Sequence, residues 1–563
     1  MEYDLKITGG TIFDGDGGAG VRGDVGIRDG RVAALGRAEG SARRTIEAEG
    51  RAVAPGFVDI HTHYDAQVFW DRMLSISPWH GVTTVMIGNC GFGVAPTRPE
   101  HRALVLRTLE KVEGMSFEAL TSGLGTEWPF ETFPEYLDAV EGLGTAINVA
   151  ALVGHSPVRL WVMGEAAMER AATAGEIERM RAVVREAIVA GAVGFATSRA
   201  PTHVGFAGKP VPSRLAELDE IRALAGALGE LGSGIVQATV GPGLFFEEFA
   251  GIAGETGRTV TWTALLSGMF GAGSHRMLLE KTAALVRRGL RIVPQVACRP
   301  LDFDFDFAEP FILESLPLFA PVSAADREGK KRIYADPEFR GKLRDYLGSN
   351  FSGPFHGCFS RMCVSSCPTR PEFEERPVDD LAREHGVDTV DFVLDLALAT
   401  DLAAHFRMAV MNYDEAEVAE LLTSGDTVLG LSDAGAHANQ LCDACFSTHL
   451  LGHWVRERGV LPLGEAVRML TSRAADVVGI TDRGRLGVGR PADVVVFDPE
   501  TVGASGLRRV RDLPAGADRL VADATGIEAV VVNGTLLRER GRDTVDPQGA
   551  LPGRLLRNGA ARA

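Results

Sequence analysis

Hydrophobic and polar positions alternate in two ways along residues 55–484 of the 563-residue chain. Short apolar runs bounded by turn residues are typical of buried strands, whereas apolar positions spaced three and four apart predict helices. The clearest helix begins at a capping box, Thr173 to Glu176. Its apolar face comprises Met180, Val183, Val184, Ala187 and Ile188. Strand-like and helix-like segments follow one another, which predicts α/β architecture with a parallel sheet.

The expected strands of this sheet are short. If they close into a (β/α)8 barrel, which the chain length accommodates beside a smaller domain, their carboxyl ends converge on one face, where active sites are built. Candidate chemical groups follow several of these runs. The expected strands are 57–60, 82–87, 192–198, 234–239, 259–264, 291–296 and 427–433.

Both ends of the chain read as short strands joined by turns, over residues 1–54 and 485–540. Asp29-Gly30 and Asn533-Gly534 are two-residue hairpin signals. Residues 541–563 read as an extended tail. An insertion at about 299–376 interrupts the barrel pattern with clustered Pro, Phe and Asp, and a lid over the catalytic face and an oligomer contact remain equally open.

Charge and composition narrow the class of protein. The net charge of −17 disfavours a nucleic-acid surface and docking on anionic membranes. The N-terminus lacks the basic start and apolar run of a signal peptide, and no apolar segment is long enough to span a bilayer, so a cytoplasmic protein is expected. Seven cysteines in such a chain do not indicate a disulfide framework.

Two histidines follow the expected strand at residues 57–60. In extended backbone, positions i and i+2 point to the same side, so His61 and His63 face one point. A single buried histidine is usually a structural hydrogen-bonding group. Two imidazoles at this spacing, followed by Asp65, favour a metal site.

These residues carry a family resemblance. The segment from Pro55 to His63, Pro-Gly-Phe-Val-Asp-Ile-His-Thr-His, resembles the first-strand signature of the amidohydrolase superfamily. The segment from Gly88 to Pro96, Gly-Asn-Cys-Gly-Phe-Gly-Val-Ala-Pro, resembles the cysteine-bearing segment of N-acyl-D-amino-acid deacylases. The resemblance implies a (β/α)8 TIM barrel at residues 55–484 and one small β-sandwich-like domain built from both chain ends.

The resemblance also implies roles at the site. Asp433 would bind a metal and act as general base, although an aspartate there could instead cap the next helix. Cys90 would be a further zinc ligand. Where the family supplies two more histidines, this chain has Gln237 and approximately Thr263, which are poor zinc ligands. We therefore expect one Zn²⁺ per chain, held by His61, His63, Cys90 and Asp433, unless His155 or His203 folds in to compensate.

The expected reaction is hydrolysis of a carbon–nitrogen amide bond in a small molecule such as an N-acyl amino acid. Metal-activated water would attack the amide, with Asp433 taking the proton. A homo-oligomer is possible. Candidate substrate-binding residues are Arg199, His203, Gln237, Arg299 and His437, the arginines because a guanidinium binds a carboxylate bidentately.

Two alternatives remain open from the sequence. The first is an enzyme of the same fold that hydrolyses a cyclic amide or performs a biosynthetic tailoring step, since two expected histidines are missing. The second is a noncatalytic binding protein that kept the barrel and lost the metal. Retention of the four ligand candidates together favours an enzyme.

Overall fold

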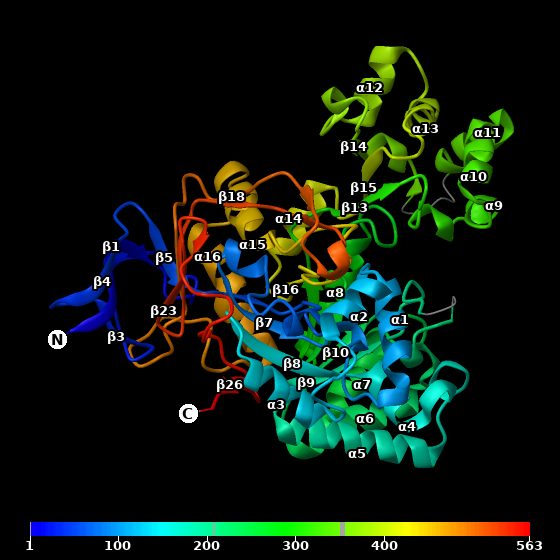
Figure 1. The fold of residues 1–563 in the computed structure, drawn as a ribbon. Coiled ribbons are helices and arrows are strands. Elements are labelled where there is room, and N and C mark those ends of the chain that lie inside the picture. Colours follow the sequence, from blue (N-terminus) through cyan, green and yellow to red (C-terminus); the bar gives the residue numbers. More distant parts are fainter. Residues whose placement is uncertain (1, 206–208, 350–354, 563) are drawn as a thin grey trace.

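The computed structural model describes residues 2–205, 209–349 and 355–562. Within them, an eight-stranded parallel sheet curls into the expected barrel (Figure 1), in the order β16-β12-β11-β10-β9-β8-β7-β6. Its strands are β6 (Phe57–Asp59), β7 (Val82–Ile87), β8 (Asn148–Gly154), β9 (Gly194–Ser198), β10 (Ile235–Thr239), β11 (Val260–Thr263), β12 (Ile292–Val296) and β16 (Val428–Leu429).

The barrel closes just beyond the ends of its first and last strands. Thr62 and Ala434 form a parallel bridge. The His63 amide donates to the Ala434 carbonyl at 2.7 Å, and the Asp433 amide donates to the His61 carbonyl at 3.1 Å. The backbone contact that closes the barrel therefore also fixes three candidate site residues relative to one another.

Helices cover the outside of the barrel. The predicted capping box at Thr173 is present, and α5 buries the apolar face expected for it, with Val183 partly buried. The main helices of this layer are α3 (Phe133–Leu143), α4 (His155–Met163), α5 (Ala174–Ala190), α6 (Leu218–Leu231), α7 (Phe246–Thr256), α8 (Ser274–Arg287), α14 (Glu415–Leu422), α16 (Leu463–Arg468) and α17 (Ala474–Val478); α1 (Arg102–Glu113) and α2 (Phe117–Leu124) lie in the connection after β7.

Both chain ends share one curled nine-stranded sheet, which encloses its own apolar core beside the barrel (Figure 1). The hairpins at Asp29-Gly30 and Asn533-Gly534 form as the turn residues predict. The strands are β1 (Tyr3–Ile12), β2 (Val21–Arg28), β3 (Arg31–Gly36), β4 (Ala42–Glu47), β5 (Ala52–Pro55), β17 (Val494–Phe497), β22 (Ile527–Val532), β23 (Thr535–Glu539) and β24 (Arg542–Asp543).

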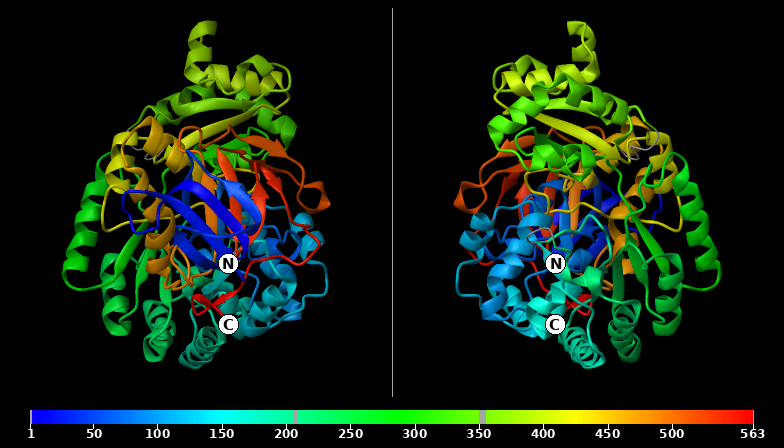
Figure 2. Two further views of the ribbon diagram at one scale, coloured as in Figure 1. Left: turned by 90° about the vertical axis from the view of Figure 1, so that its left-hand side faces the viewer. Right: turned by 90° about the vertical axis from the view of Figure 1, so that its right-hand side faces the viewer.

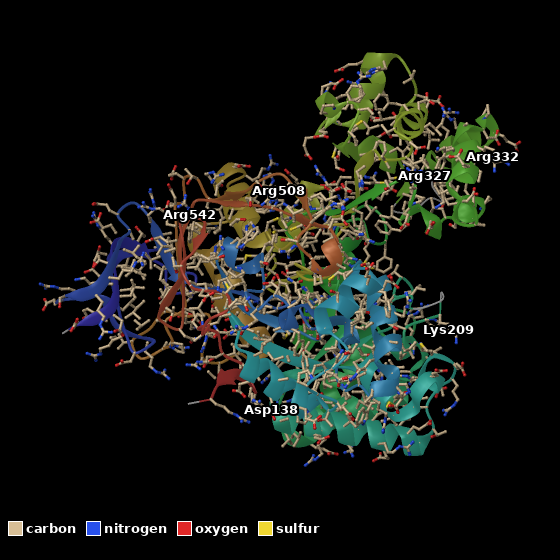
Figure 3. All side chains as sticks on the ribbon, in the orientation of Figure 1. Asp138, Lys209, Arg327, Arg332, Arg508 and Arg542 are labelled. Atoms are coloured by element: carbon tan, nitrogen blue, oxygen red, sulfur yellow. The ribbon has the colours of Figure 1, made fainter. Side chains whose placement is uncertain are left out.

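The insertion is larger than residues 299–376. Its three-stranded sheet has β15 (His405–Met411) in the centre, between β13 (Leu301–Asp306) and β14 (Met362–Ser366). It has a separate core and projects from one end of the molecule, away from both termini (Figure 2). Its outer surface is charged, as Arg327 and Arg332 illustrate (Figure 3). Its helices are α9 (Ala320–Ser323), α10 (Arg327–Ala335), α11 (Pro337–Leu347), α12 (Val378–His385) and α13 (Thr389–Ala399).

The C-terminal residues do not form a free extended tail. The Gly553 amide donates to the Thr145 carbonyl at 2.8 Å, and the Val149 amide donates to the Arg554 carbonyl at 3.0 Å. Leu556 is buried, so the last residues complete the barrel wall beside β8. Across the described residues, no helix combines the length and the apolarity needed to cross a membrane.

Candidate active site

The two histidines after β6 lie together at the barrel face, as their spacing predicts. Both are buried, and their ring centroids are 5.4 Å apart. His61 Nδ1 lies 2.8 Å from Gln295 Oε1, and Gln295 Nε2 donates to Thr261 Oγ1 at 3.2 Å. Because the Gln295 oxygen must accept, Nδ1 carries the His61 proton and Nε2 keeps a lone pair. This is the tautomer that a metal ligand needs.

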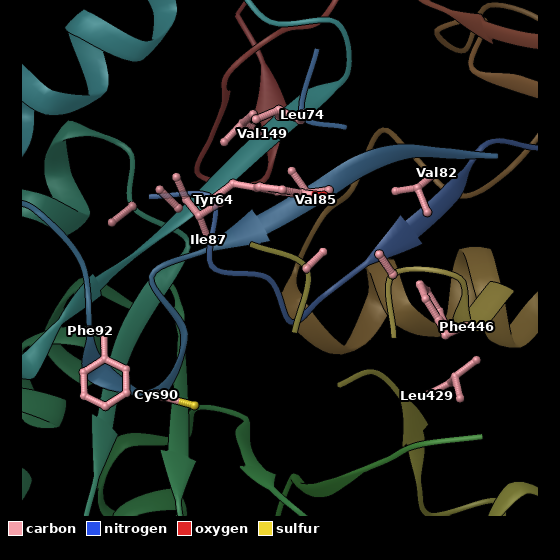
Figure 4. Close-up of a cluster of buried hydrophobic side chains, with 14 of the residues drawn as sticks. Tyr64, Leu74, Val82, Val85, Ile87, Cys90, Phe92, Val149, Leu429 and Phe446 are labelled. Atoms are coloured by element: carbon pink, nitrogen blue, oxygen red, sulfur yellow. The ribbon is translucent and has the colours of Figure 1, made fainter. Parts of the chain in front are cut away.

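Cys90 joins the histidines from the loop after β7. Its sulfur lies 3.4 Å from His61 Nε2, and the ligand atoms of His61, His63 and Cys90 all lie within 4.8 Å of one another. The backbone at Cys90 is left-handed, with φ of 57°, an uncommon conformation for a residue with a side chain. Figure 4 shows Cys90 and Phe92 leaving this same loop near the barrel face.

Asp433 approaches from the loop after β16. Its Oδ1 lies 3.3 Å from His61 Nε2 and 3.9 Å from His63 Nε2. Its φ of 46° is also left-handed, which costs free energy and recurs at functional sites. The side chain is 22% exposed, so Asp433 is the solvent-facing member of the set.

A buried hydrogen-bond network supports Asp433 from behind. Ser432 Oγ bonds Asp59 Oδ2 at 2.5 Å and the His61 carbonyl at 3.0 Å. The His61 amide donates to Asp59 Oδ1 at 3.2 Å. Burial raises the pKa of Asp59 to about 7, while its bonds to Ser432 and His61 act in the opposite direction. Asp59 thereby ties β6 to the segment that carries Asp433.

The distances from His61 Nε2 to the sulfur and to the carboxylate oxygen fit a tetrahedral zinc ion, whereas His63 Nε2 lies 3.9 Å from Asp433 Oδ1. With ordinary zinc bond lengths, tetrahedral ligands are about 3.5 Å apart for nitrogen and sulfur and about 3.3 Å apart for nitrogen and oxygen. His61 Nε2 lies 3.4 Å from the Cys90 sulfur and 3.3 Å from the Asp433 oxygen. Within the described residues, His61, His63 and Cys90 form the one cluster of at least three His, Cys, Asp or Glu side chains with metal-ligand spacing, and Asp433 lies beside it.

The Cys90 thiol has the acidity of a metal ligand. Burial raises its pKa, but the charges and hydrogen bonds of His61 and His63 outweigh burial and lower the pKa to about 6. A thiolate is therefore accessible near neutral pH, and thiolates bind zinc more strongly than thiols do.

Among the residues that the structure describes, the wall formed by β10 and β11 offers no further imidazole. Gln237 Oε1 accepts from the Cys90 amide at 2.8 Å, and Gln237 Nε2 donates to Thr263 Oγ1 at 3.4 Å. Thr263 Oγ1 in turn donates to Thr239 Oγ1 at 3.1 Å. These polar groups bond one another across β10 and β11, so this wall fits a second metal poorly.

The other sequence candidates divide between the site and its surroundings. Arg299 forms an ion pair with Asp443 at 2.7 Å, so its charge is already balanced, contrary to a free carboxylate-binding role. Arg199 donates to the Ala216 carbonyl. His437 Nδ1 bonds Gln440 Oε1 at 3.3 Å, and the Phe303 ring of the insertion packs edge-on against His437.

His203 does reach the site, by way of an aromatic contact. Its ring centroid lies 4.9 Å from that of Phe92, which lies 6.5 Å from that of His63. Sequence reasoning missed Gln295 and also Arg214, whose Nη1 donates to the His203 carbonyl at 3.0 Å. Only the inward position of Gln295 in an otherwise apolar strand could have marked it.

Comparisons with known proteins agree with this geometry. The model of the amidohydrolase family matches residues 44–297 and 356–538. The chain is 30% identical to a D-aminoacylase from Alcaligenes xylosoxydans xylosoxydans, over 94% of each protein. It is 31% identical to an N-acyl-D-glutamate deacylase from the same organism, over 100% of this chain and 98% of the relative.

A solved relative has the same overall fold. The N-acyl-D-glutamate deacylase from Bordetella bronchiseptica, complexed with zinc and a phosphonate inhibitor, superposes with a TM-score of 0.67. The match has 27% identity and covers 99% of this chain and 100% of the relative. Between its two segments, the match to the family model leaves out residues 298–355 only, so its second segment begins inside the inserted unit, before β14. With its barrel, its donor cluster and these similarities, the chain belongs to the amidohydrolase family.

Proposed function

We propose that this chain hydrolyses the amide bond of N-acyl amino acids at a single metal ion held by His61, His63, Cys90 and Asp433. The observation that carries the proposal is the spacing of the three kinds of donor atom, which matches tetrahedral zinc. A metal ion bound there supplies Lewis acidity towards water and towards the amide carbonyl.

Asp433 is suited to move the proton in this reaction. Its carboxylate lies at the donor cluster and is its most exposed member. It would accept a proton from the attacking water and deliver it to the leaving nitrogen, so that a carbon–oxygen bond forms as the carbon–nitrogen bond breaks. The Ser432–Asp59 network behind it holds the Asp433 backbone in position for both transfers.

Two guanidinium groups support a substrate that carries a carboxylate. Arg199 and Arg214 both lie in the connection after β9. Among the described residues, neither forms an ion pair with an acidic side chain. Glu220, whose charge acts on Arg199, already accepts from Arg159 and His155. The surplus positive charge in a chain of net charge −17 favours an anionic ligand.

The names of the relatives agree with this class. They are a D-aminoacylase and N-acyl-D-glutamate and N-acyl-D-aspartate deacylases. We therefore place acidic N-acyl-D-amino acids first among the substrates to test, with their L-enantiomers and neutral N-acyl-D-amino acids beside them.

The test is a substrate panel assayed by release of free amine, with protein loaded with Zn²⁺. The panel contains these linear amides together with a cyclic imide and a hydantoin, and Asp433→Asn serves as the inactive control. Turnover of linear N-acyl amino acids that is lost in the control supports the proposal. Turnover of the cyclic substrates alone would replace it with cyclic amide hydrolysis, and no turnover would favour a binding protein.

A further inference from the structure

A histidine outside the candidate metal cluster has a hydrogen-bond donor with no partner among the residues that the structure describes. His203 Nδ1 lies 2.7 Å from Ser198 Oγ, and Ser198 Oγ also accepts from the Ala200 amide at 3.2 Å. Within the described residues, Ser198 Oγ is buried and has no other acceptor for its proton, so the pairing that satisfies both groups has Ser198 donating to His203 Nδ1. A neutral imidazole that accepts at Nδ1 carries its own proton on Nε2.

The Nε2–H group is open to a ligand. No atom of residues 2–205, 209–349 and 355–562 bonds it, and the edge of the ring that carries it faces away from Ser198 at the end of β9. The His203 ring packs against the Phe92 ring, with the two planes tilted by 57°. The His203 backbone is held by Arg214, whose Nη1 donates to the His203 carbonyl. A rigid, unpaired donor beside a catalytic cluster is suited to bind charge that develops during a reaction.

His203 stays neutral while it does so. Burial lowers its pKa, and the charges of His437 and His63 lower it further, to about 3. A protonated imidazole would be attracted to the Asp433 carboxylate. A neutral imidazole is not, so its N–H stays available to an oxyanion.

We propose that His203 is a catalytic residue that donates its Nε2–H to the amide carbonyl oxygen and binds the oxyanion of the tetrahedral intermediate. This inference rests on the proposed amide hydrolysis. In the reaction, the electron pair of the carbonyl moves onto oxygen as water adds, and returns when the carbon–nitrogen bond breaks, so His203 neither gains nor loses a proton. Ser198 is a positioning residue that selects the tautomer.

The first test compares His203→Ala with His203→Gln, whose amide nitrogen reaches near the Nε2 position. We expect His203→Ala to lower kcat by about 100- to 1000-fold with little change in KM, as removal of one oxyanion donor does. His203→Gln should recover at least tenfold of this loss. The exposed His356→Ala variant is the matched control and should equal the wild type. Equal losses in both His203 variants would overturn the donor role.

A second measurement separates the transition state from the ground state. Affinity for a phosphonate analogue of the tetrahedral intermediate should fall in His203→Ala by the same factor as kcat/KM, while the zinc content stays unchanged. A rise in KM with unchanged kcat and unchanged phosphonate affinity would assign His203 to ground-state substrate binding only, and so would overturn the inference.

The tautomer provides a test that does not depend on turnover. Long-range proton–nitrogen spectra of protein labelled with ¹⁵N-histidine, assigned by loss of signal in His203→Gln, should show the proton on Nε2 in the wild type and a mixture of tautomers in Ser198→Ala. If the wild type hydrolyses no N-acyl amino acid, the proposed function falls, and this spectrum still decides on His203. A proton on Nδ1 would overturn its assignment as a donor.

Discussion

The two walls of the candidate site differ in what their polar groups do. On the wall formed after β6, β7 and β16, the side chains of His61, His63, Cys90 and Asp433 turn their donor atoms towards one point. On the wall formed by β10 and β11, Gln237 accepts from the Cys90 amide and donates to Thr263, which in turn donates to Thr239. The first wall is the one proposed to bind a cation, and the second holds the loop that carries Cys90.

This difference teaches that a wall without imidazoles can still hold the shape of a site. Gln237 satisfies the Cys90 amide at 2.8 Å, and that amide belongs to a loop held in a left-handed conformation. A buried amide without a partner would cost about 1 to 3 kcal/mol. Gln237 therefore stabilises the loop that presents the Cys90 sulfur.

Removing the proposed proton acceptor, Asp433, from the wall formed after β6, β7 and β16 should have the largest effect on activity. Asp433→Asn keeps the shape of the side chain but not its basicity, so we expect kcat to fall by about 100- to 10,000-fold. Steady-state kinetics and the zinc content measure the two consequences separately. A variant with more than a tenth of wild-type kcat would show that another group carries the proton.

A buried histidine outside both walls, in the short helix before β7, should make the stability of the protein depend on pH. Buried His80 bonds Thr448 Oγ1 at 2.7 Å and the Ala522 carbonyl at 3.0 Å, and burial lowers its pKa from 6.5 to about 4. The unfolded chain binds the proton first, so the stability is fully present above pH 6.5 and is lost as pH falls towards 4. The shift corresponds to about 3 kcal/mol.

Urea unfolding at pH 7 and pH 4.5 tests this linkage. The loss of unfolding free energy between the two pH values should be smaller in His80→Gln than in the wild type by about 2 to 3 kcal/mol. Equal pH dependence in both proteins would show that His80 does not titrate differently on folding.

The bond from Gln295 to His61 should matter for metal affinity. Gln295→Leu removes the acceptor that fixes the His61 tautomer, so zinc affinity should fall by about 10- to 100-fold. Gln295→Glu keeps an acceptor and is the control. Competition with a chromophoric chelator measures both, and unchanged affinity in Gln295→Leu would remove Gln295 from the site.

Placing imidazoles on the wall formed by β10 and β11 should remove the difference between the two walls. The double variant Gln237→His, Thr263→His is expected to raise the metal content from about one to about two ions per chain. Imidazole is a good zinc ligand, whereas the side-chain amide of Gln237 and the hydroxyl of Thr263 are not. Gln237→Asn, Thr263→Ser keeps the polarity and should stay at one ion. A count that stays at one in the histidine variant would mean that the wall cannot present ligands.

Local patterns predicted the parts of the molecule that local geometry determines. The alternation at His61 and His63, the hairpins at Asp29-Gly30 and Asn533-Gly534 and the capping box at Thr173 depend on neighbours in sequence. The family resemblance pointed to Cys90 and Asp433, and the structure brings both to the histidines. Their roles as ligands and base stay predictions.

Contacts between distant segments could not be predicted in this way. Gln295 lies 234 positions from His61, and Ser432 lies 373 positions from Asp59. The end of the insertion was missed because α12 and α13 look like barrel helices, whereas their strand β15 pairs inside the inserted sheet. Arg299 looked available because its partner, Asp443, lies 144 positions away.

The most direct test of the account is the metal content per chain of protein purified without chelator, measured by elemental analysis beside His61→Ala. We predict about one zinc-like ion per chain in the wild type and almost none in the variant. Two ions in the wild type would contradict the single-metal site and mean that ligands beyond the wall formed after β6, β7 and β16 take part. No bound ion, even after zinc is added back, would contradict the metal-dependent mechanism itself.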